Sequence, residues 1–198
     1  MTSNATTGSN GAVASTNGHS AAHVPTSLGN YTFPTGRLAR LQDANKIPLV
    51  LIACGSFSPI TYLHLRMFEM ALDYIKDSAD EFEVLGGYLS PVSDAYQKKG
   101  LEKATHRLEM VRRAVSSSTW IDLDPYEALI PSYTPTAEIL DHCHRELNKD
   151  GGAEAPDGTK KEIHVALLAG ADLLSTMTTP GVSDFILLIL TIRKTDLQ

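Results

Sequence analysis

The chain has 198 residues, 42% of them hydrophobic, which is enough for one domain of ordinary size with a buried core. It carries 23 Asp and Glu residues against 17 Lys and Arg residues, and this acidic balance argues against a general nucleic-acid binder. Two cysteines cannot build a disulfide framework, and we see neither a secretory leader nor an apolar run that spans a bilayer, so we expect an intracellular protein, nuclear or cytoplasmic, without membrane partners.

The N-terminal stretch is polar and almost uncharged. Residues 1–36 contain no Asp, Glu, Lys or Arg and are rich in Ser, Thr, Asn, Gly and Ala. Such a composition buries too little apolar surface to offset the entropy lost on ordering. We therefore predict a disordered tail over residues 1–45.

The segment 49–64, LVLIACGSFSPITYLH, is the first with a clear structural pattern. Its continuous apolar run, residues 49–53, is typical of a strand buried on both faces of a parallel sheet. Gly55 lets a ligand approach the main chain closely, and a helix that carries His64 follows. A strand, a turn and a helix start together favour an anion, and the usual anion there is phosphate.

Strands and helices then alternate along the rest of the chain. Apolar spacing predicts helices over residues 60–75, 104–115 and 136–147, strands over residues 82–89, 120–123 and 163–169, a long polar loop over residues 90–100 and a flexible surface loop over residues 148–162. This alternation predicts an α/β fold with a doubly wound parallel sheet.

Polar side chains collect where these strands end. The set comprises Ser56, Ser58, His64, Ser90, Asp94, Lys98 and Asp172. Ligands of such sheets bind beyond the carboxyl ends of the strands, so the sequence places its chemistry at one edge.

Three motifs in this order resemble one family. They are GSFSPITYLH, SPVSDAYQKKGL and LLAGADLL, and they resemble the first nucleotide motif, the mononucleotide-binding loop and the ribose-binding motif of the eukaryotic, fungal-like nicotinamide/nicotinate mononucleotide adenylyltransferases. The resemblance implies a Rossmann-like nucleotidyltransferase domain over residues 46–182. It also implies ATP and nicotinamide or nicotinate mononucleotide as substrates, with a homo-oligomer left open.

By this resemblance the mononucleotide phosphate would attack the α-phosphate of ATP, giving NAD or its deamido form and pyrophosphate. Catalysis would rest on positioning and on neutralising charge, without a covalent intermediate. Mg²⁺ would enter with ATP, and no protein metal site is implied.

The resemblance also implies residue roles. His64 would contact the α-phosphate, with Thr61 in the same motif, while Gly55, Ser56 and Phe57 would line the nucleotide site. Lys98 would meet the mononucleotide phosphate. Tyr133 would lie against the pyridine ring, followed by Thr136, and Gly170 and Asp172 would hold the ATP ribose.

Each of these residues also has a purely structural interpretation. On a helix face, His64 fits a core histidine whose ring nitrogens are hydrogen-bonded. Lys98 fits a solvated loop charge, and Asp172 fits a helix N-cap. Cys54 is better explained as a packing residue than as a nucleophile, because no acid or base partner can be placed beside it.

The resemblance stops at Val182. Ser183 stands where the family has a Trp, and the family's late phosphate-binding motif is absent from residues 183–198. We therefore expect a domain that lacks its C-terminal part, with an atypical tail from a retained intron or a frameshift. The alternative function is a poorly active or inactive nucleotide-binding or regulatory isoform.

Overall fold

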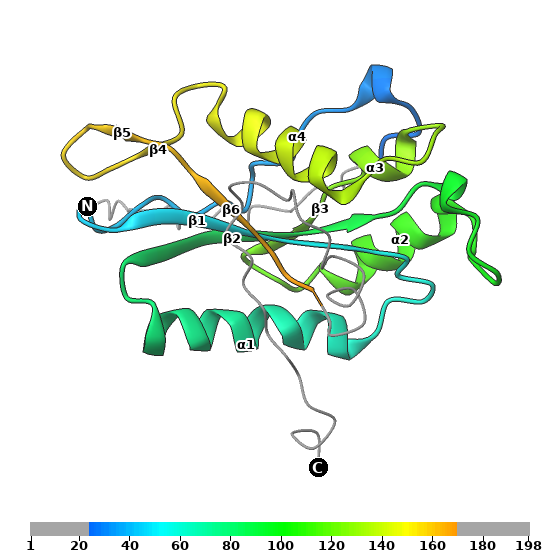
Figure 1. The fold of residues 1–198 in the computed structure, drawn as a ribbon, viewed down its shortest axis with the longest axis horizontal. Helices are drawn as coiled ribbons and strands as arrows, with labels where there is room; N and C mark the ends of the chain where they lie inside the picture. The colour runs from blue at the N-terminus through cyan, green and yellow to red at the C-terminus, as the bar shows by residue number, and fades with distance from the viewer. Residues whose placement is uncertain (1–23, 170–198) are drawn as a thin grey trace, which may run out of the picture.

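The fold is a parallel sheet covered on both faces, seen in a computed structural model that describes residues 24–169 (Figure 1). Within that range the main sheet has four strands in the order β3-β2-β1-β6, and every pair in it is parallel. The strands are β1 (Ile47–Gly55), β2 (Phe82–Pro91), β3 (Ile121–Leu123) and β6 (His164–Leu167). The predicted fold class, a parallel α/β sheet, is confirmed.

Helices lie on both sides of the sheet. They are α1 (Tyr62–Ser78), α2 (Ala104–Ala114), α3 (Tyr126–Leu129) and α4 (Thr136–Asn148), with short 3-10 turns η1 (Leu28–Asn30) and η2 (Asp94–Tyr96). In Figure 1, α1 runs below the sheet and α4 above it. The core is correspondingly split, with α1 and α2 packed on one face and α4 on the other.

Two adjacent glycines allow the residues that cover the two faces of the sheet to approach β2 closely. A Cβ at Gly87 would lie 2.6 Å from two ring carbons of Phe68, and one at Gly86 would lie 2.8 Å from Leu38. Gly86 and Gly87 weaken the strand pattern in the sequence, yet the close approach of both layers requires them. β2 also runs two residues past its predicted end, to Pro91.

The N-terminal segment, residues 24–45, is part of the folded domain. Phe33 and Leu41 are 3% and 2% exposed and lie in the core on the α4 face. The hydroxyl of Tyr88 donates to the carbonyl of Pro34 at 2.6 Å. The prediction of a disordered tail up to residue 45 is therefore wrong for residues 24–45. A few apolar side chains are enough to order this segment because they pack into the core on one face of the sheet.

Residues 148–162 are also more ordered than we predicted. β4 (Ala153–Glu154) pairs antiparallel with β5 (Lys160–Lys161), and Ala155 is buried. The side chain of Asn148 accepts from the backbone N–H of Ile163 at 2.8 Å and donates to its carbonyl at 3.0 Å. Tertiary contacts thus hold a polar, glycine-rich stretch that has no hydrophobic period of its own.

Among the helices of residues 24–169, none has the length and apolar content that a membrane span requires.

Candidate functional site

The chain reverses direction across the sheet between β1 and β6. It proceeds outward from β1 to β2 and β3, and then returns to pair β6 on the other side of β1. In open α/β sheets a crevice forms at such a switch point, beyond the carboxyl ends of the strands. The turn after β1, residues 55–61, lies at this point and carries most of the predicted phosphate-site residues.

The turn is held by its own aromatic residue and by the start of α1. Phe57 has a positive φ of 43° and only 4% of its surface is exposed. Its ring meets His64 edge to face, with 5.2 Å between the ring centroids. Thr61 is the N-cap of α1, so Pro59 precedes the helix, which begins two residues after its predicted start at residue 60.

His64 is fixed through one ring nitrogen. Its Nδ1 accepts the backbone N–H of Thr61 at 2.9 Å and lies 2.8 Å from the Thr61 hydroxyl. A neutral imidazole that accepts at Nδ1 carries its proton on Nε2. Partial burial lowers the pKa of His64, which favours this neutral form at pH 7. The ring thus offers an Nε2–H donor, a group of the kind that can donate to a phosphate oxygen.

The loop after β2 lies beside the segment that precedes α4. Ser93 Oγ donates to the carbonyl of Ile130 at 2.5 Å. The rings of Tyr96 and Tyr133 are stacked, with centroids 6.2 Å apart and planes inclined by 21°. Lys98 lies in the same loop and is exposed to solvent. The structure therefore brings the predicted mononucleotide loop together with the predicted ring-binding residue Tyr133.

The remaining predicted residues are spread around this edge. Ser56 presents its carbonyl to a buried arginine, and Thr136 is the first residue of α4. Tyr133 is 61% exposed, which leaves most of its ring open to a ligand. Gly170 and Asp172 fall outside the described residues, as do residues 183–198 of the predicted tail.

Buried carboxyl groups at this edge were missed by sequence reasoning. Asp124 follows β3 and is fully buried, and Glu127, 5% exposed, accepts from Ser90 Oγ at 3.2 Å. Burial raises the pKa of Asp124 to about 6 and that of Glu127 to about 7. The rule that placed the other polar residues at strand ends also applies to Asp124, which directly follows the predicted strand.

An aromatic and histidine cluster surrounds Asp124. Tyr31 donates its hydroxyl to Asp124 Oδ1 at 3.0 Å, and the same hydroxyl lies 3.0 Å from His142 Nε2. Tyr126 stacks on His142 with ring centroids 3.4 Å apart. His142 and Tyr31 are far apart in sequence, so no local pattern indicates their contact.

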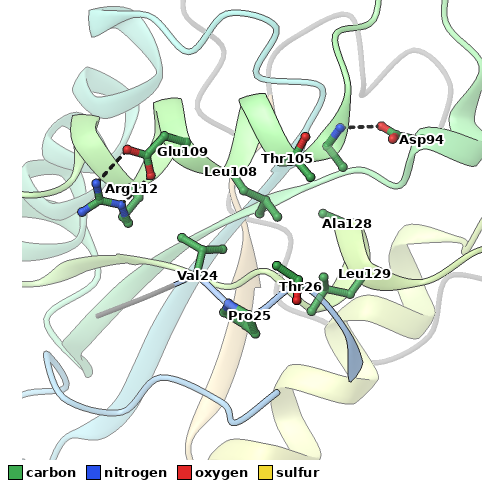
Figure 2. A pocket seen from close by; sticks show the side chains of 11 residues that line it. Val24, Pro25, Thr26, Asp94, Thr105, Leu108, Glu109, Arg112, Ala128 and Leu129 are labelled. Carbon is green, nitrogen blue, oxygen red and sulfur yellow. Dashed lines mark hydrogen bonds and ion pairs between the residues drawn. The ribbon is translucent and has the colours of Figure 1, made fainter. Parts of the chain in front are cut away.

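A separate cavity of about 620 Å³ opens between the N-terminal segment, α2 and α3 (Figure 2). Val24 and Thr26 lie on one side, Leu108 on another, and Glu109 and Arg112 are paired at its rim at 2.7 Å. Of the described polar residues that the sequence places at the strand ends, only Asp94 lines this cavity. His64 and Lys98, which the resemblance places at the phosphates, are not among the residues that line this cavity.

Within residues 24–169 no group of three His, Cys, Asp or Glu side chains is placed to hold a metal ion. Both cysteines are free thiols. Burial and nearby carboxylates raise the pKa of the Cys54 thiol, which makes it a poor nucleophile.

Comparisons with known proteins agree with the motifs. The nicotinamide/nicotinic acid mononucleotide adenylyltransferase 1 of Saccharomyces cerevisiae is 54% identical over 158 residues, which are 78% of this chain and 39% of that protein. The Schizosaccharomyces pombe enzyme of the same name is 52% identical over 158 residues, 78% of this chain and 43% of that protein. The Arabidopsis thaliana one is 45% identical over 138 residues, 70% of this chain and 55% of that protein.

The resemblance to fungal adenylyltransferases is thereby confirmed, and the chain spans about two fifths of the length of these fungal relatives. Residues 52–189 match the family described as cytidylyltransferase-like, a match that extends seven residues past the boundary that we predicted at Val182. Because this match covers more than half of the sequence, the chain belongs to the cytidylyltransferase-like family.

Proposed function

We propose that this chain belongs to an adenylyltransferase of NAD biosynthesis, which joins ATP to nicotinamide or nicotinate mononucleotide. The observation that carries the proposal is the turn after β1, where a helix start and His64 lie at the switch point of the sheet. The names of the fungal and plant relatives support the same reaction.

In the proposed reaction an oxygen of the mononucleotide 5′-phosphate attacks the α-phosphorus of ATP. A new P–O bond forms as the bond between the α-phosphorus and the bridging oxygen breaks, and pyrophosphate leaves with that oxygen. Mg²⁺ enters as part of the ATP substrate. The protein contributes orientation and hydrogen bonds to the developing charge.

The residue roles in the proposal are those that the family resemblance implies, and the geometry around His64 supports one of them. His64 donates from Nε2 to an α-phosphate oxygen, beside Gly55, Ser56, Phe57 and Thr61. Lys98 meets the mononucleotide phosphate, Tyr133 stacks on the pyridine ring, and Thr136 follows in the same binding segment. Gly170 and Asp172 hold the ATP ribose in this proposal. The free thiols are in keeping with a reducing location, nucleus or cytoplasm.

The test is a binding and product measurement on the 198-residue chain. Calorimetric titration with ATP and Mg²⁺, and separately with each mononucleotide, should show binding of both substrates. Incubation of all components should then yield dinucleotide, detected by chromatography. Binding of the mononucleotide without product would support the alternative of a nucleotide-binding regulatory chain. No binding of either nucleotide would overturn both the proposed enzyme function and this alternative.

A further inference from the structure

Arg107 is a buried charge that the proposed chemistry does not use. It lies on α2, on the stripe formed by Ala104, Leu108 and Val111, and its side chain is 0% exposed. A guanidinium without solvent contact cannot touch a nucleotide. Removing such a charge from water is costly unless its N–H donors find hydrogen-bond acceptors in the protein.

The guanidinium donates to three different stretches of the site. Nη1 bonds the carbonyl of Ser56 in the turn after β1, at 3.1 Å. Nη2 bonds the carbonyl of Val92 at 2.7 Å and Oδ1 of Asp94 at 3.0 Å, both in the loop after β2. Nε bonds the carbonyl of Glu102, just before α2, at 2.7 Å.

Other hydrogen bonds join the same stretches. The N–H of Val92 donates to the carbonyl of Gly55 at 3.0 Å, and the N–H of Glu102 donates to Ser58 Oγ at 3.0 Å. Asp94 Oδ1 also accepts the N–H of Ala104, the first residue of α2, at 2.7 Å. Arg107 is therefore the centre of a network that connects the turn to the loop.

No smaller or apolar side chain can make this connection. The planar fork of arginine presents five N–H donors in fixed directions, whereas lysine offers one point charge and an apolar residue offers nothing to the carbonyls. Two of the acceptors, the carbonyls of Ser56 and Val92, belong to the segments that carry the proposed phosphate-binding residues.

We infer that Arg107 is a positioning residue that sets the distance between the turn 55–61 and the loop 92–100. The inference rests on the proposed function, in which these two segments hold the α-phosphate and the mononucleotide phosphate. In-line attack requires the reacting atoms to approach within roughly 3 to 3.5 Å, so the relative placement of the two segments controls reactivity.

The experiment compares Arg107→Lys with Arg113→Lys, a control on the same helix whose side chain is 74% exposed and pairs only with Glu109 among the described residues. Amide hydrogen exchange is measured on the ligand-free 198-residue chains, so this readout does not depend on activity. In R107K, exchange should rise within residues 56–61 and 92–103 while the strands β1 and β6 keep their protection. R113K should match the wild type.

The second readout is affinity for each nucleotide. R107K should bind ATP and the mononucleotide about 10- to 100-fold more weakly, the range expected when a charge-assisted hydrogen bond to a phosphate is lost. If the wild type binds neither nucleotide, the proposed function fails while the exchange result still tests Arg107. If R107K exchanges and binds like the wild type, the positioning role is overturned.

Ser58→Ala perturbs the same network less than R107K, since it removes only the acceptor of the Glu102 N–H. It serves in place of R107K if that variant does not fold. Faster exchange confined to the turn and the loop is expected in S58A. Protection unchanged from the wild type, or lost evenly over the whole domain, would contradict the inference.

Discussion

His64 is oriented by the helix that carries it. The backbone N–H of Thr61, one of the donors that a helix start leaves unpaired, is satisfied by Nδ1 of His64. The same bond directs the Nε2 proton away from the helix turn, and the edge of the ring rests against Phe57. His64 is therefore part of the helix cap and also the phosphate donor of the proposed function, which makes it the first target for substitution.

Replacing His64 with alanine should weaken ATP binding, and the lost helix cap should cost about 1 kcal/mol of folding stability. A hydrogen bond to a charged phosphate contributes roughly 1.5 to 3 kcal/mol, so ATP affinity should fall about 10- to 100-fold. Calorimetric titration checks this, with His106→Ala on the exposed surface of α2 as the matched control. Equal ATP affinity in both variants would remove His64 from the site.

Glu127 is the second residue whose chemistry depends on its surroundings. It is buried beside Ser90 and near Asp124, and desolvation raises its pKa from 4.5 to about 7. A carboxyl group with a raised pKa binds its proton more strongly in the folded state than in the unfolded chain. Its contribution to stability is therefore favourable at low pH and is lost as pH rises between the two pKa values.

We expect the stability of the wild type relative to Glu127→Gln to fall by roughly 2 kcal/mol between about pH 5 and about pH 8. Glutamine keeps an acceptor for Ser90 but cannot ionise, so the difference isolates Glu127. Urea unfolding at the two pH values gives the measurement. Glu69→Gln, at an exposed position on α1, should show no such change; a constant difference between wild type and E127Q would refute the burial argument.

At the level of elements, the N-terminal segment 24–45 acts as a covering layer. From Tyr31 onward it packs on the same face of the sheet as α4, where the Phe33 and Tyr88 ring centroids are 4.9 Å apart, whereas Val24 packs on the α1 and α2 side. The N–H of Ala39 donates to the carbonyl of Leu85 in β2, at 2.7 Å, and Arg37 donates to the carbonyls of Val115 and Ile121. A segment without regular structure thereby completes the α4 face of the sheet.

Phe33→Ala should therefore destabilise the domain by about 3 to 5 kcal/mol, the usual cost of deleting a buried aromatic side chain. Leu28→Ala is the control, because Leu28 belongs to the same segment but is 42% exposed, and it should change stability by less than about 0.5 kcal/mol. Thermal or urea unfolding distinguishes them. A disordered segment would give no effect for either variant.

At the scale of the whole molecule, the sheet and its helices are predictable because their patterns are local. The apolar run at residues 49–53 indicates a buried parallel strand, and the spacing of Phe68, Ala71 and Ile75 indicates a helix face; all of these residues are buried. Residues 24–45 and 148–162 lack such a period. Their order comes from contacts with distant strands, which no window along the sequence contains.

The candidate site likewise combines local features, which the sequence predicts, with long-range contacts, which it does not. The sequence by itself determined the order of the four main strands and of α1, α2 and α4, the turn from Gly55 to His64, and the polar residues at the strand ends, because each depends on residues close together in the chain. Only the tertiary structure decided the placement of Tyr133 on Tyr96, the buried carboxyl groups of Asp124 and Glu127, and the network of Arg107. These features depend on which segments the sheet brings together, and burial then sets their pKa values and hydrogen bonds.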